Sequence, residues 1–199
     1  MRPATIGVLA LQGGVREHVR SLEMCGASAI PVKTVEQLDH VQGLVIPGGE
    51  STTIIKLAAK YDLIHVIQGM VAAGFPMFGS CAGMILLADH IVGGIEGQGT
   101  FGGIDVVVER NAFGRQAESF ESPVSIAGDN EPFPGVFIRA PLVISCGSDV
   151  NVISTIEEGH YAGRIVGIAQ GNLMATAFHP ELTNDTRVHQ IFVKRVNES

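Results

Sequence analysis

The chain has 199 residues, of which 46% are hydrophobic and 17% are charged, and its formal net charge is -7 at pH 7. Its length suits one domain, which we expect to cover residues 1–199, and its acidic balance is unlike the basic surface of a nucleic-acid-binding protein. No apolar run reaches the roughly 18 residues of a membrane span, and the three cysteines do not make a disulfide framework, so we expect a cytoplasmic protein with no nucleic-acid or membrane partner.

Apolar runs that predict strands alternate with helical patterns through the first half of the chain. The strand candidates are residues 5–11, 28–32, 43–46 and 75–78. The helical patterns cover residues 15–24, 52–61, 62–73 and 84–89. This alternation is typical of a parallel sheet with helices on both faces. We therefore predict an α/β fold with a three-layer, open, mostly parallel sheet.

A glycine-containing loop, Pro47-Gly48-Gly49-Glu50-Ser51, lies between a predicted strand and a predicted helix. Its two glycines let the backbone turn tightly and expose N–H groups. The alternatives are a plain turn or a phosphate-binding loop, but the Gly-Lys-Ser/Thr of a P-loop is absent. We interpret the peptide between Gly48 and Gly49 as a hydrogen-bond donor to an oxyanion.

The turn Gly79-Ser80-Cys81-Ala82-Gly83 leads from a predicted strand into a helix. Such an elbow lifts a nucleophile out of the sheet and places it at a helix N-terminus, where the dipole favours an anion. A cysteine is most often a small buried hydrophobe, but this setting makes Cys81 the candidate nucleophile and the Ala82 N–H a second oxyanion donor. Cys25 and Cys146 lack such a setting, and we expect them to be structural.

The second half of the chain holds more strand candidates, separated by turns. They are residues 104–110, 135–138, 142–145, 152–157, 164–170 and 173–178. We expect loops at the glycine-rich residues 93–103, which should be mobile, and at the polar residues 111–121. Residues 184–196 form an amphipathic pattern that predicts a closing helix. Its inner face would carry Val188, Ile191, Phe192 and Val196.

The segment His179-Pro180-Glu181 follows the last strand candidate. Pro180 favours an extended conformation at His179, and in an extended segment residues i and i+2 point to the same side. The imidazole and the carboxylate can therefore share a hydrogen bond at the carboxyl end of a strand, where open α/β sheets place their sites. We interpret Cys81, His179 and Glu181 as a catalytic triad. For the histidine alone, the alternative is a turn before the final helix.

Two arginines, Arg110 and Arg139, follow strand candidates. The planar guanidinium group suits a substrate carboxylate, while the alternative for each is an ordinary surface arginine. The remaining histidines show no metal-ligand spacing, and no G-x-G-x-x-G fingerprint is present. We therefore expect neither a metal nor an organic cofactor.

The triad, with its acid two positions after the histidine, resembles that of the class I glutamine amidotransferases, which implies a flavodoxin-like sheet. Residues 7–13, 47–53, 109–116, 135–141 and 178–183 resemble the glutaminase subunits of two-subunit pyridoxal 5′-phosphate synthases. The resemblance spans nearly the whole chain and departs most at residues 91–103. It implies that the triad residues are catalytic and that glutamine is contacted by Gly49, Glu50, Ser51, Arg110, Ile138 and Arg139.

The resemblance also implies a reaction and a partner. Cys81 would attack the side-chain amide of L-glutamine, ammonia would leave, and water would release L-glutamate from a thioester. The partner would be a (β/α)8 synthase subunit that uses the ammonia to make pyridoxal 5′-phosphate. Because the amidotransferase pattern fills the chain, we expect the ammonia acceptor to be a separate protein.

The main alternative is another cysteine hydrolase on the same fold, either peptidase-like or deglycase-like. The loop at residues 47–51 and the order His-x-Glu argue against it. An α/β-hydrolase is a second alternative, but there the acid normally precedes the histidine. A non-catalytic subunit is a third, and the intact triad argues against it.

Overall fold

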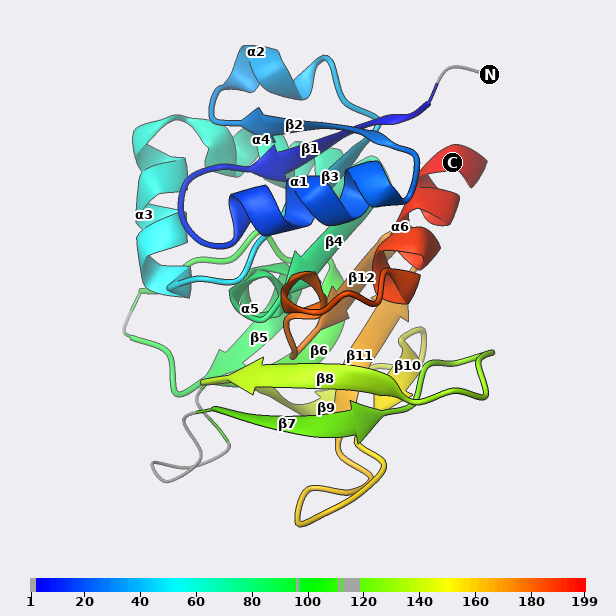
Figure 1. The fold of residues 1–199 in the computed structure, drawn as a ribbon. Coiled ribbons are helices and arrows are strands. Elements are labelled where there is room, and N and C mark those ends of the chain that lie inside the picture. The colour runs from blue at the N-terminus through cyan, green and yellow to red at the C-terminus, as the bar shows by residue number, and fades with distance from the viewer. Residues whose placement is uncertain (1–2, 96, 111, 113–118) are drawn as a thin grey trace.

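The structure is a computed structural model and describes residues 3–95, 97–110, 112 and 119–199. Within these ranges the largest sheet has seven strands in the order β10-β11-β12-β4-β3-β1-β2 (Figure 1). Its strands are β1 (Thr5–Leu9), β2 (Ser28–Val32), β3 (Gly43–Ile46), β4 (Met77–Ser80), β10 (Asn151–Thr155), β11 (Ile165–Gln170) and β12 (Leu173–Thr176). The strands from β12 to β2 run parallel, and β11 and β10 add antiparallel at one edge. The predicted open, mostly parallel sheet is confirmed.

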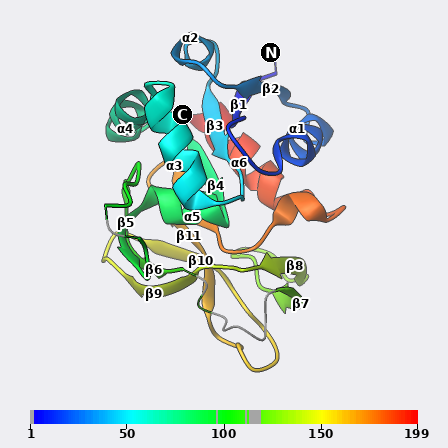
Figure 2. The same cartoon turned by 90° about the vertical axis from the view of Figure 1, so that its left-hand side faces the viewer.

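Helices cover both faces of this sheet. They are α1 (Val15–Met24), α2 (Val35–Leu38), α3 (Ser51–Lys60), α4 (Leu63–Ala72), α5 (Ala82–Leu87) and α6 (Arg187–Glu198), with a 3-10 turn, η1, at Pro180–Leu182. Figure 2 shows α1 and α6 on one face and α3 and α4 on the other, which is the predicted three-layer arrangement. No helix in the described part of the chain has both the length and the apolar character needed to cross a membrane.

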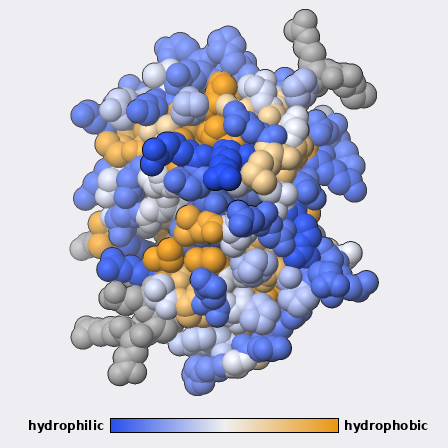
Figure 3. All heavy atoms as spheres, in the orientation of Figure 1, coloured by the Kyte–Doolittle hydropathy of each residue, from blue (hydrophilic) through white to orange (hydrophobic). Residues whose placement is uncertain are grey.

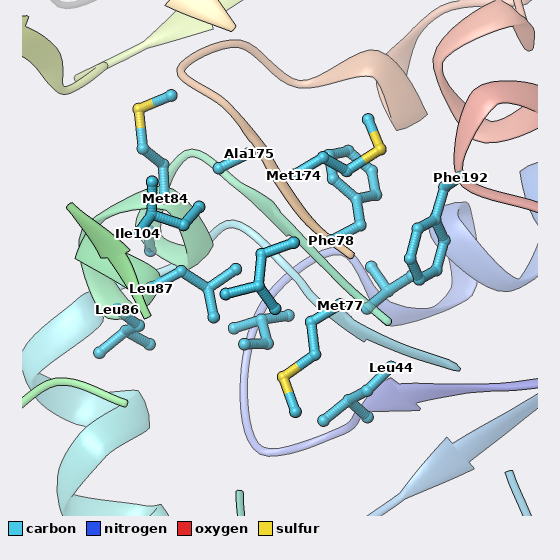
Figure 4. Close-up of a cluster of buried hydrophobic side chains, with 14 of the residues drawn as sticks. Leu44, Met77, Phe78, Met84, Leu86, Leu87, Ile104, Met174, Ala175 and Phe192 are labelled. Atoms are coloured by element: carbon cyan, nitrogen blue, oxygen red, sulfur yellow. The ribbon is translucent and has the colours of Figure 1, made fainter. Parts of the chain in front are cut away.

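The central strand β4 is buried on both sides. Met77 and Phe78 are both fully buried, and Phe78 packs against Phe192 of α6 with 5.8 Å between ring centroids (Figure 4). Figure 4 also shows Leu86 and Leu87 of α5 in the same cluster. Burying a side chain of this size contributes about 1.5–3 kcal/mol to stability. The strand that leads to the predicted nucleophile is therefore held rigidly.

Helix α6 begins later than residue 184, where we predicted it. The Asp185 carboxylate accepts a hydrogen bond from the Arg187 N–H at 3.0 Å, so the chain turns into the helix only at Arg187. The predicted inner face is confirmed, because Val188, Phe192 and Val196 are buried and Ile191 packs against the core.

Two smaller sheets lie beside the main one within the described ranges. One pairs β5 (Ala88–Val92), β6 (Ile104–Glu109) and β9 (Leu142–Cys146), and the other pairs β7 (Ser119–Val124) with β8 (Phe133–Ile138). The sequence did not predict β5 or β7. Residues 88–92 continue a helical pattern, and we predicted a helix up to residue 89. Yet α5 ends at Leu87 and Ala88 is already extended.

Strand β7 overlaps the polar segment 111–121 that we predicted as a loop. Its pairing with β8 places Phe120 opposite Phe137, and the two rings stack at a centroid distance of 4.6 Å. Cross-strand aromatic pairs of this kind stabilise a strand that has a polar composition. Residues 111 and 113–118 of the predicted loop lie outside the described residues.

The glycine-rich segment 93–103 has no helix or strand in its described part, as predicted. Its second half is nonetheless anchored. Phe101 is 4% exposed and its N–H donates to the Leu86 carbonyl at 2.7 Å. The Gly103 N–H donates to the Asp89 carboxylate at 2.7 Å. These contacts hold the segment against α5 and β5.

Candidate active site

Cys81 lies at the sharp turn between β4 and α5, as predicted, although β4 ends at Ser80 rather than at residue 78. Its backbone has φ 48° and ψ -101°, a conformation that is strained for a residue with a side chain. The Cys81 N–H donates to the Thr176 carbonyl at 2.8 Å, which holds the turn. A Cβ at Gly83 would collide with the Ile46 carbonyl oxygen, so only glycine lets α5 pack this closely on the sheet.

His179 and Glu181 follow β12 and lie at the start of η1. The His179 Nδ1 is 2.7 Å from Glu181 Oε1, and both residues are buried. The predicted strand 173–178 ends early, at Thr176, and the chain turns at Pro180 rather than staying extended. The imidazole and the carboxylate still meet, but a 3-10 turn brings them together and not the extended segment that we predicted.

The parallel pairing of β12 with β4 brings the triad together. Thr176 pairs with Ser80, so the residues that follow these two strand ends are neighbours. The Cys81 side chain lies close enough to the His179 imidazole to raise its pKa, and both side chains lie against the backbone of Gly48. The Cys81 Sγ also lies 3.7 Å from the Ile138 carbonyl oxygen. The structure therefore brings the three predicted triad residues together, with a hydrogen bond between His179 and Glu181.

The charge states of His179 and Glu181 follow from these contacts. Burial lowers the pKa of His179, but hydrogen bonds to Cys81 and Glu181 outweigh it and raise the pKa to about 10. Burial raises the pKa of Glu181, but the neighbouring His18 and the hydrogen bond from His179 bring the pKa down to about 2. Glu181 therefore holds a protonated His179 beside Cys81.

The predicted oxyanion donors surround Cys81. A Cβ at Gly48 would collide with the His179 ring and lie 3.3 Å from Cys81 Cβ, so the loop passes directly over the triad. Gly49 and Ala82 line the same cavity as Cys81. Ala82 is the first residue of α5, and the first N–H groups of a helix have no intrahelical acceptor.

A cavity of about 480 Å³ opens beside the triad, a size typical of small-molecule sites. It is lined by Gln12, Gly49, Glu50, Ser51, Cys81, Ala82, Ile85, Arg110, Ser119, Ile138, Arg139 and His179. The six residues predicted to contact substrate are all among them. Figure 3 shows apolar side chains gathered on the surface between α5 and β8, where this cavity lies.

Sequence reasoning missed three lining residues, Gln12, Ile85 and Ser119. Gln12 follows β1, and its Oε1 accepts a hydrogen bond from the Glu50 N–H at 2.7 Å. Its position just after a parallel strand was a signal that could have identified it. Ser119 belongs to β7, which the sequence did not predict.

Arg110 is not an isolated surface arginine. Its guanidinium donates to Glu50 Oε1 and to Gln98 Oε1, each at 2.8 Å, and Gln98 in turn donates to Ser51 Oγ at 3.0 Å. The Arg110 side chain is only 12% exposed, while that of Glu50 is 51% exposed. The two opposite charges are thus fixed side by side on one wall, a pairing that suits the two charged groups of an amino acid. Arg139, with φ 46°, lines the cavity next to Ile138.

Within the described ranges, no group of three or more His, Cys, Asp and Glu side chains is placed to hold a metal ion. Residues 8–198 match the SNO glutamine amidotransferase family. The chain belongs to this family. The match agrees with a cysteine, a histidine and a glutamate arranged around a cavity that carries paired charges.

Relatives of this SNO family member are similar over nearly their whole length. The chain is 54% identical to "Pyridoxal 5'-phosphate synthase subunit PdxT" of Nocardioides sp., covering 98% of this chain and 96% of that one. It is 55% identical to the protein of the same name in Salinispora arenicola, with 98% of each covered. A solved structure described as a glutamine amidotransferase superposes with a TM-score of 0.88 at 43% identity and covers 96% of this chain and 98% of that one.

A more distant solved structure is that of a putative GMP synthase component from Thermoplasma acidophilum. It has a TM-score of 0.68 at 17% identity, with 100% of this chain and 96% of that chain covered. This likeness shows a shared fold.

Proposed function

We propose that this chain hydrolyses L-glutamine to L-glutamate and ammonia through a thioester on Cys81. The observation that carries the proposal is that Cys81 and His179 line one cavity, His179 is hydrogen-bonded to Glu181, and the same cavity holds an Arg110–Glu50 ion pair. Membership of a glutamine amidotransferase family supports the choice of glutamine as substrate.

The triad performs the chemistry in two stages. The Cys81 thiolate attacks the side-chain amide carbon of glutamine, and a negatively charged oxygen forms. His179 donates a proton to the amide nitrogen, the C–N bond breaks, and ammonia leaves. Water then gives a proton to His179 and attacks the thioester, which releases glutamate and restores the thiolate. Glu181 keeps the His179 ring oriented through Nδ1, so that Nε2 is the nitrogen that moves protons.

The surrounding residues bind glutamine and stabilise the oxyanion. We assign oxyanion stabilisation to Ala82 N–H and to the peptide of Gly48 and Gly49. The Gly49, Glu50 and Ser51 segment holds the amino-acid end of glutamine together with Arg110, Ile138 and Arg139. Glu50 suits the α-ammonium group and the arginines suit the α-carboxylate, because each offers an opposite charge.

The ammonia goes to a partner subunit. Relatives that align with 96–98% of their length are named as subunits of pyridoxal 5′-phosphate synthase, and we propose that this chain assembles with a (β/α)8 synthase subunit in the cytoplasm. Residues 1–199 would act as one amidotransferase domain, which the family match over residues 8–198 supports. Ile138, 40% exposed at the cavity, offers apolar surface for such a partner.

The test is glutamate release from L-glutamine by the purified chain mixed with a synthase subunit. We expect activity that Cys81→Ala abolishes, while Cys25→Ala and Cys146→Ala retain it. A glutamine-like electrophile should label Cys81 alone. Release of glutamate by Cys81→Ala would refute the proposal, and turnover of peptides or glycated thiols in place of glutamine would point to the peptidase-like or deglycase-like alternative.

A further inference from the structure

A row of buried polar side chains lies behind the triad, between α1 and α6. His18 of α1, Ser80 of β4 and His189 of α6 are each 0% exposed. The His18 Nε2 is 2.9 Å from Ser80 Oγ, and the His18 Nδ1 is 2.9 Å from His189 Nε2. The Phe78 ring packs edge-on against both imidazoles at centroid distances of 5.9 Å. These side chains are sealed inside the protein and do not touch the cavity.

This row contacts both halves of the proposed catalytic machinery. Ser80 Oγ accepts a hydrogen bond from the Gly48 N–H at 3.0 Å, at the start of the oxyanion loop. The same His18 Nε2 that meets Ser80 also lies 3.4 Å from Glu181 Oε2. One imidazole nitrogen therefore faces the triad carboxylate and the hydroxyl that anchors the loop.

The hydrogen positions follow from charge. Burial lowers the pKa of His18 despite the charge of Glu181, and burial lowers the pKa of His189 to about 3, so both rings are neutral at pH 7. A neutral His18 with a bare Nε2 would aim a lone pair at the Glu181 carboxylate. The favourable arrangement puts the proton on His18 Nε2, and His18 Nδ1 then accepts from His189 Nε2–H.

We propose that His18 is a positioning residue for this glutaminase, which with Ser80 sets the triad carboxylate and the oxyanion loop in one fixed geometry. The proposal rests on the proposed function and adds residues outside the triad and the cavity lining. His179 pairs with Glu181 Oε1, whereas the buried Oε2 has no hydrogen-bond partner, so the His18 Nε2–H that lies 3.4 Å from it offsets part of the buried charge on that side. Because Ser80 holds the Gly48 N–H, a rotation of the loop backbone would fall on the next peptide, between Gly48 and Gly49.

A purely structural role would favour an apolar side chain here. Burying polar groups without full pairing costs stability, and His189 Nδ1 is buried without a partner. A leucine among Phe78 and its neighbours would avoid that cost. The structure has two imidazoles and a hydroxyl here instead, and they contact the Glu181 carboxylate and the Gly48 N–H.

The first experiment uses two substitutions that differ by one methylene. A glutamine amide nitrogen reaches the position of an imidazole Nε2, whereas an asparagine amide reaches only as far as Nδ1. We expect His18→Asn to lower kcat for glutamine by about 10- to 100-fold with KM little changed, because misplaced catalytic groups cost rate rather than binding. His18→Gln should recover most of that loss. His65→Asn and His65→Gln on the exposed side of α4 are the matched controls.

A second experiment separates the two contacts of His18. Ser80→Ala removes the anchor of Gly48 and leaves Glu181 untouched, so kcat should fall while alkylation of Cys81 by iodoacetamide, which needs no oxyanion donor, stays within about twofold. His18→Asn should slow both reactions. If a His18 variant does not fold, Ser80→Ala still tests the inference, because this substitution removes only one oxygen atom.

The outcomes divide clearly. Wild-type kcat in folded His18→Asn or in Ser80→Ala would overturn the inference while an inactive Cys81→Ala keeps the proposed function. Equal loss in His18→Gln and His18→Asn, with both folded by thermal melting, would also overturn it. Glutamate release that survives Cys81→Ala would instead overturn the proposed function itself.

Discussion

At the scale of single residues, Gly48 is the position where one atom decides the geometry of the site. A side chain there would occupy the space of the His179 imidazole and would touch Cys81. The absence of a Cβ at Gly48 is therefore a requirement of the triad and not of the turn.

We expect Gly48→Ala to lower glutaminase kcat by at least about 100-fold, because the His179 ring must move out of line with the sulfur. Glutamate release measures the effect. Gly69→Ala on α4 is the control, since a Cβ there meets open space. It should leave activity unchanged and raise the free energy of unfolding by about 0.5–1 kcal/mol. Normal turnover by Gly48→Ala would contradict the placement of the loop over the triad.

The His179–Glu181 pair also predicts how stability depends on pH. The pKa of Glu181 falls to about 2 in the folded protein, so its contribution is lost as pH drops from about 4.5 toward 2. The pKa of His179 rises to about 10, so its contribution is lost as pH rises from about 6.5 toward 10. The free energy of unfolding of wild type minus that of Glu181→Gln should peak between these limits. Urea unfolding across pH measures it, and a flat difference would refute the ion pair.

At the scale of elements, the loop before α3 is held from two sides. Gln12, just after β1, accepts from the Glu50 N–H, and Arg110, just after β6, binds the Glu50 carboxylate. The Glu50 side chain additionally caps α3 by accepting from the Thr52 N–H at 3.3 Å. The start of one helix is thus fixed by residues at the ends of two strands.

Arg110→Ala should weaken glutamine binding more than it slows chemistry. It removes a cation from the cavity wall and releases Glu50, so we expect KM to rise about 10- to 100-fold with a smaller change in kcat. Steady-state kinetics measure both constants. Arg164→Ala, at an exposed position outside the cavity lining, is the control and should match wild type. A large fall in kcat with unchanged KM would contradict a binding role.

The individual elements also show which strands and site residues could be predicted from the sequence. The strands Ser28–Val32 and Gly43–Ile46 were predicted with their true bounds because each is a short, mostly apolar run between clear turn residues. β5 was missed because its apolar residues continue the pattern of α5. β7 was missed because its stability comes from Phe137 on another strand. Gln12 carried only the signal of its position after β1, and His18 carried no local signal, since only the fold brings it behind the triad.

At the scale of the whole molecule, the proposed function requires the ammonia to reach a second protein. We expect the glutaminase rate to rise when the synthase subunit binds, because docking can turn the Gly48–Gly49 peptide, which glycine allows at little steric cost. Rates of glutamate release with and without the partner measure this. Equal rates would show that the oxyanion site is already complete in the isolated chain.

The position of β12 has a consequence for how the enzyme comes into being. This strand lies next to β4 in the middle of the sheet, yet it is synthesised well after β4. Until β12 inserts, one edge of β4 has no partner strand, and such an exposed strand edge can pair with other chains. Cys81 is synthesised early, but His179, its proposed proton acceptor, is placed beside it only when β12 pairs with β4. The proposed glutaminase activity therefore begins only after β12 has taken its place between β11 and β4.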